Sequence, residues 1–232
     1  MFIGIGNPIP EIANLPGPSR PGGGGGAFEY TAIDNSFSME FDGISSYYYG
    51  PMLGDLIDLG QYTSKFSISC WVYAPAPQYK GICGASSFSN GLRIYTYQNT
   101  IYFNIGGGAS TIVGNATYAG GWHHVAATCD LTSSGTTMYL YFDGNEIANG
   151  SGTRNGYDFV NFNLDIGAQN DSNGTPADFS LGNIDEFSIW NVVLDEKTIK
   201  AIYDTTANNP GKVADLSETP EGAPAAWYRM GD

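Results

Sequence analysis

The sequence predicts an all-β protein, built as a two-sheet antiparallel jelly-roll sandwich with one short helix toward its C-terminal side and extended arms at both ends. Tyr and Phe are common, with 16 and 12 copies among 232 residues, and only 14% of the residues are charged. This balance favours strands over helices. From about residue 36 onward, apolar and polar residues alternate, and the alternating segments recur about every ten residues, as in a sandwich.

Residues 1–26 contain five prolines and end in five consecutive glycines, a composition that excludes any regular element. We therefore expect residues 1–35 to form an N-terminal arm. It is either a disordered tail or an anchor that orders on a partner surface through its small apolar residues. The segment lacks the basic region and the continuous apolar stretch of a secretory signal.

Three segments predict strands by their period of two. In residues 66–73, Phe66, Ile68, Cys70 and Val72 share one face, while Ser67, Ser69, Trp71 and Tyr73 share the other. Residues 92–97 and 100–106, separated by Gln98 and Asn99, predict a hairpin. In residues 137–150, Met138, Leu140 and Phe142 alternate with Tyr139 and Tyr141 before a turn around Gly144.

One helix is predicted in residues 194–204. Asp195 is placed to cap its first amides, and Leu194 to pack on Ile199. Ile199, Ile202 and Tyr203 form its packed face. Residues 206–232 then predict a C-terminal extension with a final edge strand.

Five segments, in order and spacing, resemble the strands of laminin-G-like jelly-roll domains of the concanavalin A-like lectin/glucanase superfamily. They are "SMEFDGISSYY", "FSISCWVYAP", "GWHHVAATCD", "MYLYFDGNEIA" and "NIDEFSIWNVVLDEKTIKAIY". The resemblance covers about residues 36–205 and implies a sandwich of two curved sheets that binds glycans or proteins and is often stabilised by calcium. The terminal segments also look like laminin-G-like structural proteins of tailed bacteriophages.

The last residues, "WYRMGD", resemble the strand that usually opens such domains, yet here they stand at the C-terminus. Two explanations remain open. Either residues 227–232 fold back beside the first strand, within or between subunits, or they begin a further repeat.

His123 and His124, in "GWHHVAATCD", are the only two histidines of the chain. Neighbouring strand residues point to opposite faces, and Cys129 lies about 20 Å further along at about 3.3 Å per residue, so the three do not form a compact metal site. We interpret the segment as a structural strand. The three cysteines, Cys70, Cys83 and Cys129, have no metal-binding spacing and are interpreted as reduced core thiols.

Catalysis is not predicted. β-Glucanases of this superfamily carry an E-x-D-x-x-E strand with two catalytic glutamates. The nearest match begins at Glu40 and Asp42, but Ser45 stands in place of the second glutamate.

Calcium is the one cofactor expected. The family resemblance implies a site formed by Asp42, Gly43 and Asp185, although Asp185 has an alternative role in binding backbone amides. The loop with Asp171, Asn173 and Asp178 is a second candidate, with a solvated turn as its alternative.

A sugar site needs exposed aromatic faces and planar polar side chains. The candidates are Tyr95, Tyr97, Tyr118 and Tyr157, together with Tyr47, Tyr48 and Tyr49, near Asn99, Asn115 and Asn155. Each of these tyrosines has the alternative role of a cross-strand packing partner.

The formal net charge of −14 disfavours nucleic acid, whose binding requires a basic surface, and no segment is apolar enough to insert into a membrane. The resemblances predict a non-enzymatic virion surface protein, a bacteriophage capsid decoration or fibre-type component. It would bind other virion proteins through its N-terminal arm, form a homo-oligomer or occur in many copies, and adhere weakly to glycans. The alternative is a freestanding or cell-surface carbohydrate-binding module.

Overall fold

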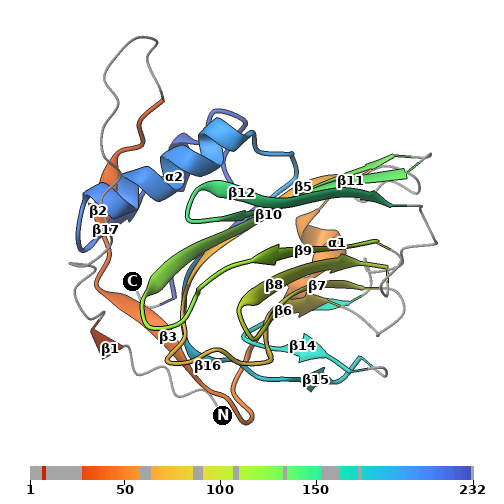
Figure 1. Ribbon diagram of the computed structural model, residues 1–232. Coiled ribbons are helices and arrows are strands. Elements are labelled where there is room, and N and C mark those ends of the chain that lie inside the picture. The colour runs from red at the N-terminus through yellow and green to blue at the C-terminus, as the bar shows by residue number, and fades with distance from the viewer. Residues whose placement is uncertain are drawn as a thin grey trace.

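The computed structural model describes residues 7–8, 28–57, 64–85, 91–106, 110–132, 135–152, 162–171 and 174–230. Two antiparallel sheets pack face to face, and a helix lies on the outer side of one of them (Figure 1). The predicted all-β sandwich is confirmed.

The first sheet has the order β1-β3-β16-β5-β10-β11-β12. Its strands are β1 (Asn7–Pro8), β3 (Phe37–Asp42), β16 (Leu181–Trp190), β5 (Ser64–Tyr73), β10 (Trp122–Thr132), β11 (Gly135–Phe142) and β12 (Asn145–Gly152). A further strand, β18 (Ala226–Tyr228), also pairs with β16. The second sheet has the order β4 (Tyr48–Met52), β13 (Asn163–Ile166), β6 (Lys80–Ala85), β7 (Leu92–Tyr97), β8 (Thr100–Ile105) and β9 (Ser110–Asn115).

Smaller elements complete the fold. β2 (Ala32–Asp34) pairs with β17 (Lys212–Ala214), and β14 (Gln169–Asn170) pairs with β15 (Pro176–Ala177). The helices are α1 (Leu53–Leu56), α2 (Glu196–Asn208) and the short η1 (Leu216–Glu218). None of the helices among the described residues is long and apolar enough to cross a membrane.

The core lies between the two sheets, and the predicted strand faces are confirmed. Phe66, Ile68, Cys70 and Val72 of β5 are buried there with Met138 and Leu140 of β11. The opposite faces of β5 and β11 point away from this core. The predicted hairpin is also present, because β7 pairs with β8 through the turn at Gln98 and Asn99.

Helix α2 covers the outer face of the first sheet. The carboxylate of Asp195 accepts the N–H of Thr198 at 2.7 Å, as a helix cap does. Ile199 and Ile202 are buried in a second apolar cluster, which contains Trp190 of β16 and Tyr141 of β11. The predicted helix, its cap and its packed face are therefore confirmed.

Both chain ends contribute to the folded unit. The predicted boundary at residue 35 follows β2, and the boundary at residue 205 falls within α2. β18 folds back within the chain and pairs with residues 187–189 of β16, next to the stretch of β16 that pairs with β3. Glu186, at the bulge between these two stretches, has a φ of 52° and accepts a hydrogen bond from the indole of Trp227 at 2.6 Å.

Candidate functional site

The outer face of the second sheet carries its side chains in rows that run across the strands. Cross-strand register places Tyr95 of β7 beside Tyr102 of β8, and Tyr102 beside Val113 of β9. A second row, two residues away along each strand, contains Arg93, Asn104 and Thr111. A third contains Tyr97, Thr100 and Asn115. We call the three rows together the tyrosine face.

Aromatic rings are concentrated in the middle of this surface. The rings of Tyr95 and Tyr102 are stacked, with centroids 4.7 Å apart and planes 9° apart. Tyr79 contacts Tyr95 and Tyr97 edge-on, each at 5.8 Å. Tyr79 and Tyr97 remain 45% and 46% exposed. The tyrosine face therefore offers apolar ring surface to a ligand, bordered by polar side chains.

The polar row beside the rings is connected by hydrogen bonds. The guanidinium of Arg93 donates to Asn104 Oδ1 at 3.2 Å, and Asn104 Nδ2 donates to Thr111 Oγ1 at 2.6 Å. Arg93 also lies 5.8 Å from the centroid of the Tyr95 ring, a cation–π contact. Arg93 and Asn104 are themselves buried, at 6% and 2% exposed, so they order the Tyr95 ring and its surroundings, and Thr111 is the exposed member of the row.

This polar row continues across the whole sheet to β4. Gly84 of β6 and Asp165 of β13 follow Arg93 in register, and Tyr49 of β4 follows Asp165. β14 covers this stretch, because a Cβ added at Gly84 would lie 2.7 Å from Asn170 Oδ1. Asn170 Nδ2 donates to Asp165 at 2.8 Å, and burial raises the pKa of that carboxyl group.

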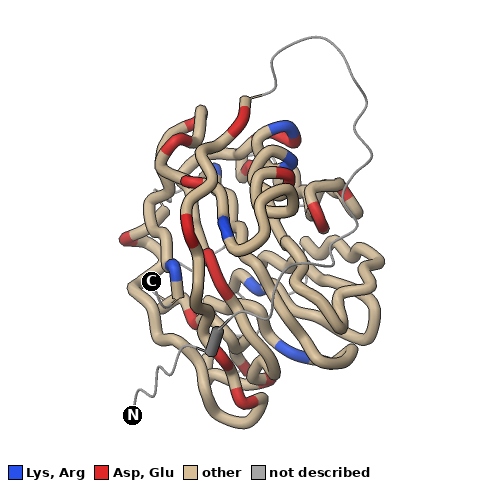
Figure 2. The backbone as a smooth tube through the Cα atoms, turned by 90° about the vertical axis from the view of Figure 1, so that its left-hand side faces the viewer, with Lys and Arg blue, Asp and Glu red and all other residues tan. Residues whose placement is uncertain are grey.

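Charge is sparse on the tyrosine face, although the protein is acidic. Strands β7, β8 and β9 contain a single charged residue, Arg93. Elsewhere Asp and Glu follow the strands turned toward the viewer in Figure 2, with few Lys and Arg among them. The surface is therefore suited to an uncharged ligand, and the surrounding negative potential disfavours an anionic one.

Among the predicted sugar-stacking residues, Tyr95 and Tyr97 lie together on this surface. Tyr49 is 58% exposed but lies at the far edge of the same sheet. Tyr157 and Asn155 lie outside the described residues. No local sequence pattern singles out Tyr79, Tyr102, Arg93 or Asn104 as surface residues of this sheet. The predicted hairpin register gave a usable signal for Tyr102, because it places this residue opposite Tyr95.

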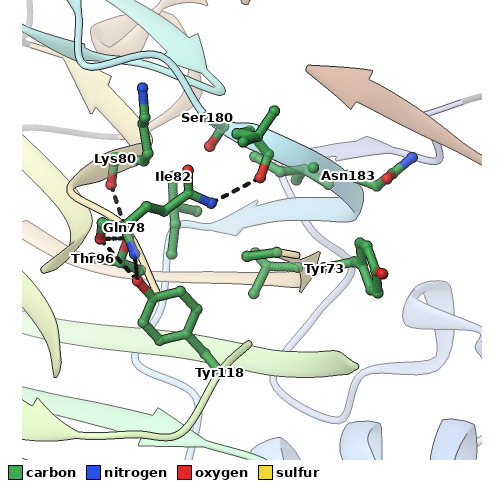
Figure 3. A pocket seen from close by; sticks show the side chains of 13 residues that line it. Tyr73, Gln78, Lys80, Ile82, Thr96, Tyr118, Ser180 and Asn183 are labelled. Carbon is green, nitrogen blue, oxygen red and sulfur yellow. Dashed lines mark hydrogen bonds between the residues drawn. The ribbon is translucent and has the colours of Figure 1, made fainter. Parts of the chain in front are cut away.

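Tyr118 is a correction, because it belongs to the interior. It is 1% exposed, its hydroxyl accepts the N–H of Gln78 at 2.7 Å, and it donates to the carbonyl of the same residue at 2.8 Å. It borders a cavity of about 20 Å³, shown in Figure 3 with Gln78, Thr96 and Asn183. This volume holds about one water molecule, so a sugar ring does not fit and Tyr118 has no free ring face.

The residues of the first predicted calcium site do not converge. Asp42 accepts the N–H groups of Ile44, Ser45 and Ser46 at 2.8–2.9 Å, and these bonds hold the pKa of its carboxyl group well below the usual range. The carbonyl of Gly43 accepts a hydrogen bond from the Lys80 ammonium at 2.9 Å. A positive charge from the protein itself therefore lies at the predicted backbone ligand.

Asp185 lies elsewhere on β16. Asp42 is in register with Leu181, and Asp185 is four residues further along, about 13 Å away at about 3.3 Å per residue. Its carboxylate binds Asn35 Nδ2 at 2.7 Å and the N–H of Glu186 at 2.8 Å. The amide-binding role, the alternative raised from the sequence, describes these contacts.

The second predicted cation loop is only partly described, because Asn173 lies outside the described residues. Asp171 accepts the N–H of Thr175 at 3.0 Å, and Asp178 accepts from Gln169 at 2.6 Å. Over the described part of the chain, no three His, Cys, Asp or Glu side chains are grouped so that they could hold a metal ion. Calcium binding stays a prediction.

The two histidines occupy separate environments, as their strand positions predict. His123 Nδ1 lies 2.8 Å from Asp143 Oδ2. His124 is fully buried beside Trp71 and Tyr203, and its Nε2 lies 2.7 Å from Ser69 Oγ. Burial lowers the pKa of His124 to about 4. Because neither His124 nor Ser69 is accessible, this pair is structural.

Solved structures share the fold at low sequence identity. A proposed carbohydrate-binding protein from Bacteroides ovatus matches with a TM-score of 0.58 at 16% identity, over 88% of this chain and 52% of that one. Domain 4 of AbnA, an extracellular arabinanase from Geobacillus stearothermophilus in complex with arabinotriose, matches with a TM-score of 0.52 at 17% sequence identity. The match covers 75% of this chain and 80% of that one. Botulinum neurotoxin type C matches with a TM-score of 0.53 at 16% sequence identity, over 76% of this chain and 45% of that one.

The chain spans about half the length of the first and third of these structures. A search of curated proteins finds no match. A family model described as the concanavalin A-like lectin/glucanases superfamily, Laminin_G_3, matches residues 50–200, which include most strands of both sheets. The chain therefore belongs to this laminin-G-like family.

Proposed function

We propose that the protein is a non-enzymatic, lectin-like module that binds neutral glycans on its tyrosine face. The observation that carries the proposal is the juxtaposition of stacked, partly exposed tyrosine rings with the exposed side chains of Thr111 and Asn115 in the neighbouring rows. A pyranose or furanose ring has an apolar C–H surface and hydroxyl groups at its edge. Rings and planar polar groups side by side match both features.

The solved structures with the same fold support this proposal. One is described as carbohydrate-binding, one holds arabinotriose, and the botulinum neurotoxin requires two ganglioside molecules to enter cells. Gangliosides are acidic, however. The single charged residue of β7, β8 and β9 and the net charge of −14 favour a neutral glycan for this protein.

The test is a glycan array of neutral, sialylated and sulfated glycans, followed by titration of the neutral glycans that bind. Tyr102→Ala should weaken binding at least about tenfold, the equivalent of about 1.4 kcal/mol. Tyr49→Ala is the matched control, because Tyr49 is an exposed tyrosine on the same sheet, four strands away from Tyr102. Equal losses in both variants, or exclusive binding of acidic glycans, would contradict the proposal.

A display role on a virion surface is the second candidate. The observation that favours it is the Pro/Gly-rich N-terminal segment. Many weakly binding copies on one particle would gain avidity without new contacts. Deletion of residues 1–26 should prevent incorporation into particles while the domain still folds, and normal incorporation would refute this role. The alternative is an extracellular or cell-surface lectin.

A further inference from the structure

We propose that the bound glycan is an extended chain that runs across the strands from the tyrosine face into a cleft between β9 and β12. This inference rests on the proposed function and adds a second subsite to it. It makes an oligosaccharide or polysaccharide, rather than a single sugar, the ligand for which the surface is built.

The cleft lies where the two sheets end. β9 is the last strand of the second sheet and β12 the last strand of the first, so neither has a ladder partner on its outward side among the described strands. The cavity between them measures about 230 Å³. This is more than ten times the volume of the one-water cavity beside Tyr118, and it gives room for one sugar ring.

The lining combines an apolar floor with polar walls. Met138, which is 1% exposed, lies at the base, and the hydroxyl groups of Ser110 and Ser151 and the amide of Asn149 border it. None of the lining residues is charged. Gly150 lets β12 approach β9 closely at the bottom of the cleft, since a Cβ at this position would lie 2.7 Å from Ile112 Cγ2. The same combination of apolar and hydroxyl-binding surface characterises the tyrosine face.

Two residues connect the cleft with the tyrosine face. Val113 lies in register with Tyr102 and is 45% exposed, and Thr111 ends the hydrogen-bonded row that begins at Arg93. Both also line the cleft. A ligand that leaves the ring row at Tyr102 therefore reaches the cleft across one strand, a spacing of about 4.8 Å.

The stacking of the tyrosines gives the direction of the chain. One face of the Tyr102 ring is taken by Tyr95, which has Tyr79 and Arg93 beside it. Because the stacked rings belong to neighbouring strands, the other face of Tyr102 is turned toward β9 and Val113. Val113 lies beside Tyr102 on that side, so a sugar ring rests over the exposed parts of Tyr102 and Val113 above β9, and the next unit of a chain lies over the cleft.

The experiment titrates the full chain with neutral oligosaccharides of increasing length, from the monosaccharide to the hexasaccharide, in the series that binds best on the array. Affinity should rise by about tenfold or more once the chain is long enough to reach the cleft. Ala148→Leu and Ala148→Phe, which add side-chain volume inside the cleft to two extents, should remove this gain and leave the affinity of the shortest ligands within twofold. Thr137→Tyr is the control, because Thr137 is the exposed neighbour of Ser151 on β11 and lies outside the cleft.

The outcomes separate the two proposals. Affinity that does not depend on chain length but is lost in Tyr102→Ala would overturn the cleft subsite and retain the tyrosine face. A length-dependent gain that survives both cleft variants, with their folding checked by thermal denaturation, would also overturn it. Absence of saturable binding at every length would overturn the proposed function and the cleft subsite together.

Discussion

The outer faces of the two sheets come from the same alternating sequence pattern but differ in how far their aromatic residues are exposed. On the first sheet, the outward-pointing Trp190 and Tyr141 are 0% and 4% exposed, because α2 packs over them. On the second sheet, β14 covers the stretch around Gly84, and Arg93 and Asn104 are buried, but Tyr97 is 46% exposed and Tyr95 and Tyr102 are partly exposed. The lesson is that an outward aromatic residue is a binding candidate only where no later element of the chain covers it.

The largest expected effect on stability is on the outer face of the first sheet, which α2 covers. Trp190→Ala removes a fully buried ring from beneath α2 and should lower the free energy of unfolding by about 3–5 kcal/mol, the range for truncation of a large core aromatic residue. Urea denaturation measures it. A loss below about 1 kcal/mol would mean that α2 is not packed on this face, and the distinction between the two faces would fail.

A pH-dependent effect is expected next, and again on the covered face. His124, buried beside Trp71 and Tyr203, has a pKa of about 4, against 6.5 for the unperturbed group. Between these values the unfolded chain binds a proton that the native state does not. Stability should therefore fall as the pH drops from about 6.5 to about 4, by up to about 3 kcal/mol.

Urea midpoints at a series of pH values test this expectation. His124→Gln removes the titrating group, so its stability should depend less on pH over this window than that of the wild-type protein, whatever its absolute stability. An equally steep dependence in both proteins would show that another group is responsible.

The comparison of the two faces also shows what the sequence can and cannot predict. Period-two alternation correctly divided the residues of β5 and β11 between the two sides, and Asp195 marked the start of α2, because these signals are local. Neither signal says which side a distant element will cover. Tyr118 and Tyr97 look alike in sequence, yet Gln78 lies against the hydroxyl of the first, and the second stays open.

The candidate site was predicted only in part for the same reason. Tyr95 and Tyr97 were identified as aromatic residues of one strand. Tyr79 lies in a loop, and its contact with both rings depends on tertiary structure. The predicted calcium ligands were carried over from a family resemblance, which does not reveal that Lys80 reaches the carbonyl of Gly43.

The smallest expected effect on stability is on the tyrosine face. Tyr97→Ala removes one edge-on contact with Tyr79 and little buried surface, so the free energy of unfolding should change by no more than about 1 kcal/mol. Glycan affinity should nevertheless fall, because the ring belongs to the proposed binding surface. Urea denaturation and titration of the same variant measure the two effects. A large loss of stability with unchanged binding would reverse the roles assigned to the faces, since Tyr97 would then be a packing residue like Tyr141.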